Sequence, residues 1–377
     1  MIRNKPMNIF AEYIDGAATA QFYDAMAQDY SVAGALMPDA HKGYGLPIGG
    51  VVATKGMVVP SWVGYDIGCG MCAIMTSYDT QDVIDNGQEI FDRILEAIPV
   101  GFKHHQHAQV WKKQDQYARS VDADRIFDFK NGLHQMGTLG GGNHFIEIGV
   151  DENDMVWVII HSGSRGVGHA IAQHYMKIAG GGKAREGHYP LSTDSKEGAD
   201  YWEDLNYMLE FALENRCQML SRIEEIMTDV CYAGMFKWDT MINRNHNHAT
   251  FKSVEGLGDV IIHRKGATHA EEGMMGVIPG NMKDGSFIVR GKGNPESLFS
   301  SSHGAGRVLG RAQAKRELDT ELFVEEMKNI VSCACEDTLD ESPAAYKDIF
   351  KVMKEQEELV EIVAHVRPLI NIKSSKG

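Results

Sequence analysis

Seven short segments, most of them rich in glycine, carry clusters of histidine, cysteine, aspartate and arginine. They span residues 37–43, 64–70, 137–147, 161–166, 245–248, 279–282 and 302–307. Because glycine costs backbone entropy in a regular element, such segments indicate unusual torsions or close approach of the backbone to a ligand. The stretches between them do not alternate as a doubly wound sheet or a barrel would. The chain is therefore predicted to be mixed α/β, with central β-sheets packed with helices.

Hydrophobic periodicity gives a coarse set of elements. Short strands are expected within 45–60 and at 155–160, 259–263 and 286–290, and helices at 80–98 and 199–232, the last with the strongest 3.6-residue period. Ser342 and Pro343 are expected to open a C-terminal helix as its N-cap and first residue. No repeat or linker interrupts the pattern, so residues 1–377 are predicted to form a single catalytic domain.

Composition narrows the class of protein. The 377 residues are 43% hydrophobic and 24% charged, which suits a large globular core. No signal-peptide region and no run of 18 apolar residues occurs, so a soluble, cytoplasmic protein is expected. Six cysteines are too few for a disulfide framework. The net charge of −15 argues against non-specific nucleic-acid binding, although a metal site can supply local positive potential.

Thiolate, carboxylate and imidazole groups within these segments are the usual parts of a metal site. Asp66 and Cys69 lie three residues apart in a glycine-bounded turn, a spacing that can aim both at one ion. His144 follows a run of backbone amides, and His161 ends an apolar strand. Each residue alone is more often structural, since aspartate forms turns and a histidine beside glycine is usually satisfied locally. The metal hypothesis therefore depends on these segments converging in space.

Two further patterns carry little weight. Cys69 and Cys72 have the spacing of a redox motif, but no thioredoxin-like βαβ context surrounds them. The run His104 to His107 is predicted to be part of an exposed, solvated loop rather than a metal site.

A basic stretch, residues 306–316, contains no acid. Arg307, Arg311 and Lys315 are spaced by four, so they are predicted to share one face of a helix. That face is either simply solvated or, because it follows His303 directly, a phosphate-contacting surface. No Walker-type phosphate loop is present.

Eight motifs together carry a family resemblance. They are MPDAHKGYGLPIGG, VGYDIGCGM, GTLGGGNHFIEI, HSGSRGVG, RKGA, IPGNM, SHGAGR and PAAYKDI. In this order they resemble the RtcB-type RNA ligases, from about residue 30 to the end. The resemblance implies the RtcB-type fold and an enzyme that uses GTP and Mn²⁺. Such an enzyme joins RNA 2′,3′-cyclic phosphate or 3′-phosphate ends to 5′-hydroxyl ends, in tRNA splicing or RNA repair. It proceeds through a guanylated histidine and an RNA(3′)pp(5′)G intermediate.

The resemblance also implies residue roles. His303 would be the guanylated histidine, Asp39 would transfer a proton near the RNA end, and Arg165 and Arg307 would contact phosphate. Two Mn²⁺ ions would be bound by Asp66, Cys69, His144, His161 and His246. The guanylate pocket would comprise Asn143, His144, Phe145, Ile146, Glu147, His246, Asn247, Pro279, Gly280, Asn281, Met282, Ser286, His303, Gly304, Ala305, Gly306 and Tyr346. Within it, Glu147 would read the guanine N1–H and N2 amine. Ligand chemistry alone would suggest zinc.

The chain departs from the family pattern in two places. Asn281 stands where the family usually has serine, and the ending IKSSKG leaves Lys373 or Lys376 as the lysine that reaches the guanine. Two alternative functions stay open at this point. A metal-dependent cyclic phosphodiesterase or phosphatase acting on RNA ends would need the metal residues but not His303. A catalytically idle RNA-binding relative would be expected to have lost ligands.

Overall fold

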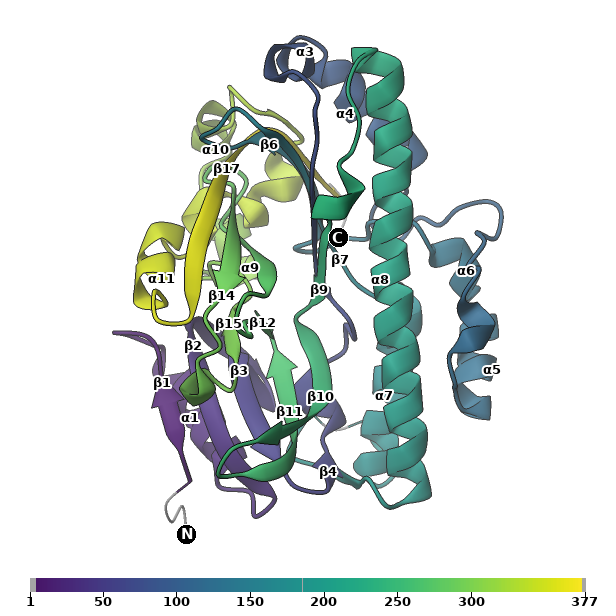
Figure 1. The fold of residues 1–377 in the computed structure, drawn as a ribbon, viewed down its shortest axis with the longest axis vertical. Helices are drawn as coiled ribbons and strands as arrows, with labels where there is room; N and C mark the ends of the chain where they lie inside the picture. Colours follow the sequence, from purple (N-terminus) through teal and green to yellow (C-terminus); the bar gives the residue numbers. More distant parts are fainter. Residues whose placement is uncertain (1–4, 185, 375–377) are drawn as a thin grey trace.

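In the view of Figure 1, a larger β-sheet occupies the upper half of the molecule and a five-stranded β-sheet the lower half. One long helix runs alongside both sheets. The computed structural model describes residues 5–184 and 186–374. The five-stranded sheet has the order β1 (Met7–Ile9), β2 (Ser31–Tyr44), β3 (Leu46–Thr54), β11 (Gly258–Lys265) and β10 (Asn247–Val254). The larger sheet has the order β13 (Met275–Pro279), β14 (Ser286–Gly291), β17 (Val360–Lys373), β6 (Phe145–Val150), β7 (Val156–Ser162), β5 (Gly70–Met75) and β9 (Ile242–Asn245), with β16 (Val331–Ser332) paired to β17.

Antiparallel pairing dominates both sheets, and only β1–β2 and β16–β17 pair in parallel among the strands described. The predicted class, mixed α/β without a doubly wound sheet, is confirmed. The strands predicted at 155–160, 259–263 and 286–290 are confirmed as β7, β11 and β14. The glycine-punctuated stretch 45–60 contains β3 and the short strand β4 (Met57–Val58), which pairs with β8 (Leu191–Ser192).

Helix α8 (Lys196–Cys231) confirms the helix predicted at 199–232. It begins after Ser195, whose side chain accepts a hydrogen bond from the Gly198 amide. Its 36 residues span about 54 Å at 1.5 Å per residue, so it reaches along both sheets. The remaining helices are α1 (Gly16–Met26), α2 (Pro60–Val63), α5 (Val121–Phe129), α6 (Gly132–Gln135), α7 (Arg165–Ala179), α9 (Arg311–Glu317) and α10 (Thr320–Glu326), besides those described next.

Two helix predictions were wrong in detail. The helix predicted at 80–98 is two helices, α3 (Thr80–Asp85) and α4 (Gly87–Ala97), because Asn86 leaves helical torsions and caps α3. The helix predicted to open at Ser342 begins instead at Ile349, as α11 (Ile349–Glu355). Pro343–Ala345 forms only a 3-10 turn, and the Asp348 carboxylate accepts the first free amides of α11.

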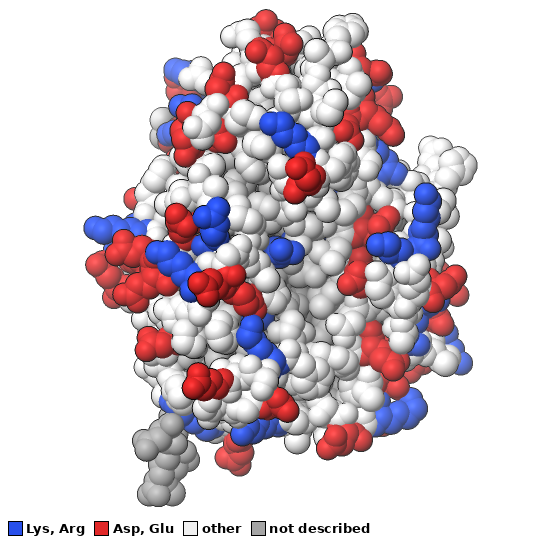
Figure 2. All heavy atoms as spheres, in the orientation of Figure 1, with Lys and Arg blue, Asp and Glu red and all other residues white. Residues whose placement is uncertain are grey.

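The surface in Figure 2 mixes acidic and basic side chains, and neither sign forms a continuous band on that face. This agrees with the argument that the negative net charge disfavours non-specific nucleic-acid binding. Among the described residues, no helix combines the length and the apolar character that crossing a bilayer requires.

Candidate functional site

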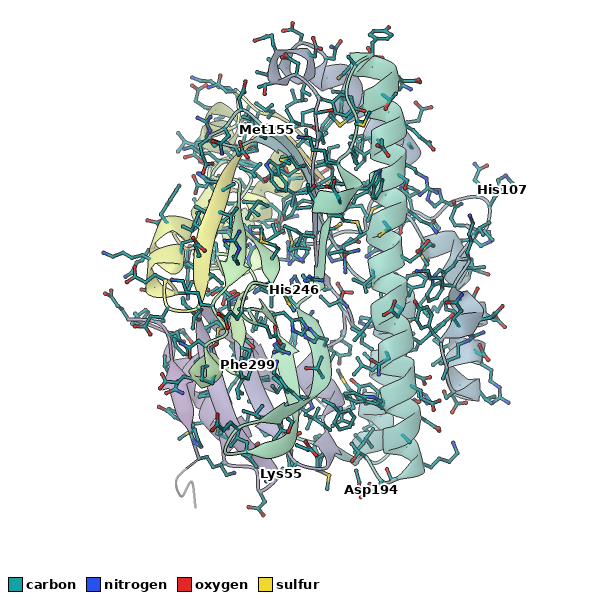
Figure 3. All side chains as sticks on the ribbon, viewed as in Figure 1. Lys55, His107, Met155, Asp194, His246 and Phe299 are labelled. Carbon is teal, nitrogen blue, oxygen red and sulfur yellow. The ribbon has the colours of Figure 1, made fainter. Side chains whose placement is uncertain are left out.

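The predicted metal residues meet where the two sheets join. His246 is the single residue between β9 of the larger sheet and β10 of the smaller one, and it lies near the centre of the molecule (Figure 3). Asp66 and Cys69 occupy the turn before β5, His144 immediately precedes β6, and His161 lies near the end of β7. Neighbouring strands of one sheet thus bring together residues that are far apart in the sequence.

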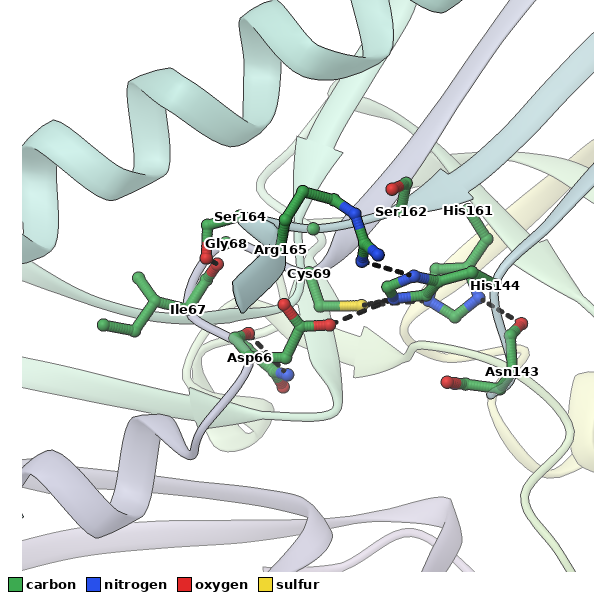
Figure 4. A network of polar contacts seen from close by, with 12 residues as sticks. Asp66, Ile67, Gly68, Cys69, Asn143, His144, His161, Ser162, Ser164 and Arg165 are labelled. Atoms are coloured by element: carbon green, nitrogen blue, oxygen red, sulfur yellow. Dashed lines mark hydrogen bonds and ion pairs between the residues drawn. The ribbon is translucent and has the colours of Figure 1, made fainter. Parts of the chain in front are cut away.

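The side chains of these five residues form one cluster, in which all but Asp66 are buried. Figure 4 shows Asp66, Cys69, His144 and His161 of this cluster. The Cys69 Sγ atom lies 3.2 Å from His161 Nε2 and 3.4 Å from His144 Nε2. Asp66 Oδ2 lies 3.0 Å from His144 Nε2, and the Nε2 atoms of His161 and His246 are 3.3 Å apart. The cysteine sulfur and the His144 and His161 nitrogens all lie within 4.8 Å of one another. This is the convergence on which the metal hypothesis depends.

Hydrogen bonds orient two of the imidazoles toward the cluster. Nδ1 of His144 lies 3.0 Å from the Leu139 carbonyl oxygen, and Nδ1 of His161 lies 3.1 Å from that of Asn143. A carbonyl only accepts, so both Nδ1 atoms carry a proton, and the Nε2 atoms face the Cys69 sulfur and, for His144, the Asp66 carboxylate. A single thiol proton can satisfy at most one imidazole lone pair, whereas a cation between the sulfur, the carboxylate and the imidazoles would interact with all of them. The donor set therefore fits a divalent metal ion.

Burial sets the protonation states of the cluster. It raises the pKa of the Cys69 thiol and lowers the pKa of both His161 and His246, so the imidazoles stay neutral. Burial opposes the charge of Asp66, but the His144 imidazole and the Arg165 guanidinium together hold its pKa below the ordinary value. Neutral imidazoles and a carboxylate are ready to coordinate, whereas the thiol must lose its proton to do so.

A buried arginine of α8 fixes the cluster from behind. Arg216 is fully buried and donates to the Gly68 carbonyl at 3.0 Å and to the Ser162 carbonyl at 2.7 Å. It also donates to the side chains of Asn243 and Asn245, at 2.7 and 2.6 Å. One side chain thereby ties together the turn before β5, the end of β7, and β9. Sequence reasoning missed it, because the apolar period of α8 identified only a packed helix.

Arg165 lies beside the cluster at the start of α7. Its backbone is left-handed, with φ +58°, which is a strained conformation for a residue with a side chain. Its guanidinium lies over Gly140, where a Cβ would be only 2.1 Å away. Nη1 is 3.3 Å from His144 Nδ1, and Nε donates to the Thr138 hydroxyl at 3.2 Å. The predicted phosphate-contacting residue is thus held in place next to a cluster histidine.

His303 follows the short strand β15 (Ser300–Ser302), which pairs with β12 (Ala267–His269). Its Nδ1 lies 2.6 Å from Oδ2 of Asp39, a fully buried carboxylate on β2, and its backbone amide donates to the same oxygen at 3.2 Å. The His303 and His246 rings are 4.8 Å apart and nearly perpendicular. Asp39 therefore contacts the predicted nucleophile itself and leaves the His303 Nε2 atom for a ligand.

A cavity of about 240 Å³ opens beside the cluster, with His161 and His303 in its wall. The predicted pocket residues that line it are Asn143, Phe145, Glu147, Pro279, Gly280, Asn281, Met282, His303, Gly304, Ala305, Gly306, Tyr346 and Lys373. Six further lining residues were not predicted as pocket residues: His41, Ile48, His161, Arg307, Arg311 and Asn371, of which His161 was predicted as a metal ligand and Arg307 as a phosphate contact. Asn371 lies on the strand that ends at Lys373, two positions away, so strand alternation could have found it.

Strand β6 shows how the pocket is built. Phe145 and Glu147 line the cavity, while Ile146 packs into the hydrophobic core on the opposite face. Burial raises the pKa of Glu147 to about 8. Glu147 Oε1, Ser286 Oγ and Asn371 Oδ1 are buried and have no hydrogen-bond partner within residues 5–184 and 186–374. Buried orphan acceptors of this kind are costly unless a ligand satisfies them.

Some predicted residues have other positions. The Asn247 side chain donates to the Asp66 carbonyl at 3.1 Å and accepts from the Gly266 amide at 2.8 Å, so it joins two loops and does not line the cavity. Lys376 lies outside the described residues. Lys373 ends β17 in the cavity wall, where its ammonium contacts the Glu341 carboxylate and lies 5.3 Å from the centre of the Phe145 ring.

The basic stretch is not the single helix face predicted. Helix α9 begins at Arg311, and Arg307 instead pairs with Tyr346 in an isolated β-bridge, so that prediction was wrong. The cations are paired with acids: Arg307 lies 3.3 Å from Glu341, and Lys315 lies 3.4 Å from Asp340. Burial works against the charge of Glu341, but nearby cations, Lys373 foremost, hold its pKa at about 2.

Comparison with known proteins places the chain in a family. The model of the family described as tRNA-splicing ligase RtcB matches residues 24–374. The RNA-splicing ligase RtcB of Escherichia coli K12 is 35% identical over 370 residues, which cover 90% of this chain and 89% of that protein. The tRNA-splicing ligases RtcB of Archaeoglobus fulgidus and Thermococcus kodakarensis are 30% and 28% identical, over 90% and 89% of this chain and 87% and 86% of their own lengths. This chain therefore belongs to the RtcB family of tRNA-splicing ligases.

Proposed function

We propose that this protein is an RNA ligase that uses GTP and Mn²⁺ to join RNA 3′-phosphate or 2′,3′-cyclic phosphate ends to 5′-hydroxyl ends. The names of its relatives support RNA joining. The observation that carries the chemistry is the position of His303. This residue contacts the buried Asp39 carboxylate, lies against the metal-ligating cluster and forms part of the cavity wall.

His303 suits the role of a nucleophile that carries GMP. With Nδ1 held by Asp39, the Nε2 lone pair attacks the α-phosphorus of GTP, and the bond to pyrophosphate breaks. An oxygen of the RNA 3′-phosphate then attacks that phosphorus, and the N–P bond breaks to give RNA(3′)pp(5′)G. Finally the 5′-hydroxyl attacks the RNA 3′-phosphorus, and GMP leaves. Asp39 stabilises the protonated imidazole as the leaving group in the second step.

Asp66, Cys69, His144, His161 and His246 are proposed to hold two Mn²⁺ ions. When bound, these ions orient phosphate oxygens and neutralise the charge that develops on them. The thiolate and imidazole donors would suit zinc equally well, and manganese is inferred from the family. Arg165, fixed beside His144, is proposed to contact an RNA phosphate.

The orphan acceptors in the cavity wall, Glu147 Oε1 and Asn371 Oδ1, are proposed to bind guanine. Guanine presents two donors along one edge, N1–H and the N2 amine, and ionised Glu147 offers two acceptors to them. Adenine presents no such pair. Glu147→Gln is therefore expected to reduce the selectivity for GTP over ATP by about tenfold or more. Competition of each nucleotide for protein labelling would measure this, and unchanged selectivity would show that guanine is read elsewhere.

The decisive experiment tests for the guanylated histidine. Folded, Mn²⁺-loaded protein is incubated with α-labelled GTP, denatured and separated by electrophoresis, and the label is tested in acid and in alkali. We expect an acid-labile, alkali-stable label that His303→Ala abolishes while Mn²⁺ binding persists. His365→Ala serves as a matched control, because His365 is half-buried against Phe287 and does not line the cavity.

Each outcome has a definite meaning. A label that depends on His303 makes the sealing of RNA ends the next assay. Absence of label in folded, metal-loaded protein would contradict the ligase mechanism and favour a metal-dependent phosphodiesterase or an RNA-binding relative. Label retained in His303→Ala would overturn the choice of nucleophile alone.

A further inference from the structure

The first part of the connection between α4 and α5, which ends before Asp115, differs in charge from the acidic chain as a whole. Residues 97–114 contain no aspartate or glutamate but include Lys103, Lys112 and Lys113. The chain as a whole has 52 acidic and 37 basic residues. The segment also contains the run His104 to His107, and His107 lies at the outer edge of the molecule (Figure 3). Neither the metal cluster nor the nucleotide cavity accounts for these residues.

Backbone hydrogen bonds hold this segment in a defined shape although it has little regular structure. The Gly101 amide donates to the Gly140 carbonyl at 2.8 Å, and the His105 amide donates to the His134 carbonyl at 3.0 Å. Farther along, the Gln109 amide donates to Leu133 at 2.9 Å. The outward side chains include Lys103 and Phe102, whose side chain is 87% exposed. The Phe102 ring is thus presented to solvent from an anchored backbone, an arrangement that allows a base to stack on it.

The same segment adjoins the metal cluster. The Gly101 carbonyl lies 3.4 Å from Nη2 of Arg165, whose Nη1 contacts His144. The cluster opens to solvent at Asp66, whose side chain is 34% exposed, and the Arg165 charge acts on that carboxylate. Phe102 and Lys103 directly follow Gly101 in the chain, and neither lines the nucleotide cavity.

We propose that Phe102 and Lys103 form a docking surface for the single-stranded RNA whose end enters the metal cluster past Arg165. This inference rests on the proposed function and adds to it the path of the substrate. Unpaired bases near an RNA end stack on exposed aromatic rings, and lysine contacts the phosphate between them. The net charge of −15 repels RNA, but this acid-free stretch with its lysines is locally positive and complements the RNA phosphates.

The test measures RNA binding without turnover. A fluorescent single-stranded RNA with a 5′-hydroxyl end is titrated with full-length, Mn²⁺-loaded protein in the absence of GTP. Phe102→Ala is expected to raise Kd about tenfold. Lys103→Gln is expected to lower the slope of log Kd against log salt by about one. Both side chains are exposed, so the variants are expected to fold and to be labelled by GTP like the wild type.

The chain offers a matched control with the same dipeptide. Phe350 and Lys351 are exposed on α11, on the opposite side of the molecule from α5 and α6 in Figure 1. Phe350→Ala and Lys351→Gln should bind RNA like the wild type. If the Phe102 and Lys103 variants bind no worse than these controls, the docking surface is wrong, even if ligation is established. If they lose binding while no protein is labelled by GTP, the surface stands and the proposed ligase mechanism fails.

Discussion

At the scale of single residues, burial decides which protonation state each group offers to a ligand. Glu147 is 1% exposed, and burial raises its pKa to about 8, so at neutral pH the empty pocket holds mostly the protonated acid. A ligand that donates two hydrogen bonds would favour the carboxylate instead. Glu341 is the opposite case, because surrounding cations keep it charged at every pH at which the protein would be assayed.

Glu147→Gln is expected to change how stability depends on pH. The unfolded carboxyl titrates near its ordinary pKa of 4.5 and the folded one near 8, so the unfolded chain loses its proton first. The wild type therefore loses stability as pH rises through that window, whereas glutamine cannot ionise. In thermal unfolding without nucleotide, the Tm of the variant should rise relative to the Tm of the wild type as the pH increases from about 4.5 to about 8. A difference in Tm that did not vary with pH would contradict a buried acid at this position.

Glu341 is expected to act by positioning the pocket cations. Its carboxylate contacts Lys373, Arg307 and Arg311, and it accepts from the Tyr346 hydroxyl at 2.6 Å. Glu341→Gln should raise the KM for GTP in protein labelling by roughly tenfold and change kcat less, because binding geometry is lost and the nucleophile is not.

The neighbouring acid provides the control for that prediction. The Asp340 side chain pairs with Arg311 at 2.6 Å and with Lys315 at 3.4 Å, and its carboxylate does not contact Lys373 in the described structure. Asp340→Asn should therefore leave KM nearly unchanged. Equal effects of the two substitutions would argue against a specific role for Glu341.

The sequence predicted roles only for residues that stand within local motifs. Motif resemblance singled out Cys69, His161 and His303, and the structure brings each of them into or beside one buried cluster. Arg216 was out of reach, because it stands in a helix whose apolar period explains it as packing. Its role arises from tertiary neighbours that no spacing in the sequence encodes, whereas strand alternation from Lys373 could have found Asn371.

At the scale of elements, α8 both packs the core and supports the site. Its period predicted the packing correctly, since residues such as Leu205, Met208 and Ile223 are fully buried. The same period gave no sign that Arg216 would face the cluster loops, nor that its neighbour Asn215 would donate to the Gly163 carbonyl at 3.2 Å. Where an element ends was also decided by tertiary partners. Tyr346, for example, pairs with Arg307, and the helix predicted from Ser342 starts only after it.

Arg216→Met is expected to damage the cluster through this helix. The substitution leaves the buried carbonyls of Gly68 and Ser162 without their donor, at a cost of about 1–3 kcal/mol each. Urea unfolding should show a lower midpoint, and equilibrium dialysis should show weaker Mn²⁺ binding. Arg222→Met is the control, since Arg222 of the same helix is only half-buried and contacts Gln109 and Gly137. Equal Mn²⁺ affinity in both variants would show that Arg216 does not position the metal-binding residues.

At the scale of the whole molecule, the proposed metal-binding cluster connects the two sheets. His144 and His161 belong to the larger sheet, and His246 stands where the chain passes from one sheet to the other. The sequence predicted the mixed class of the fold but not the order of the strands. Pairing partners such as β3 and β11 lie some two hundred residues apart, and many alternative pairings satisfy the same local patterns.

Removal of the metal is therefore expected to loosen the molecule globally. An ion bound only by the folded state stabilises it by about 2.7 kcal/mol when its concentration is 100 times Kd. Chelation should lower Tm by several degrees in the wild type, and readdition of Mn²⁺ should restore it. Cys69→Ala should bind fewer ions and show a smaller shift. An identical shift in that variant would show that Cys69 is not a ligand.

The position of β17 bears on how the protein is made. This last strand lies between β14 and β6 in the larger sheet and brings Asn371 and Lys373 to the pocket. On a ribosome, β6 and β14 emerge before β17, so the position between them in the sheet is an open slot. Their edges stay unpaired until β17, which ends at residue 373, has been synthesised. A nascent chain without β17 would lack Asn371 and Lys373 of the proposed nucleotide pocket, so the pocket is complete only once β17 is in place. Until then the open slot exposes two unpaired strand edges, a kind of surface that favours aggregation.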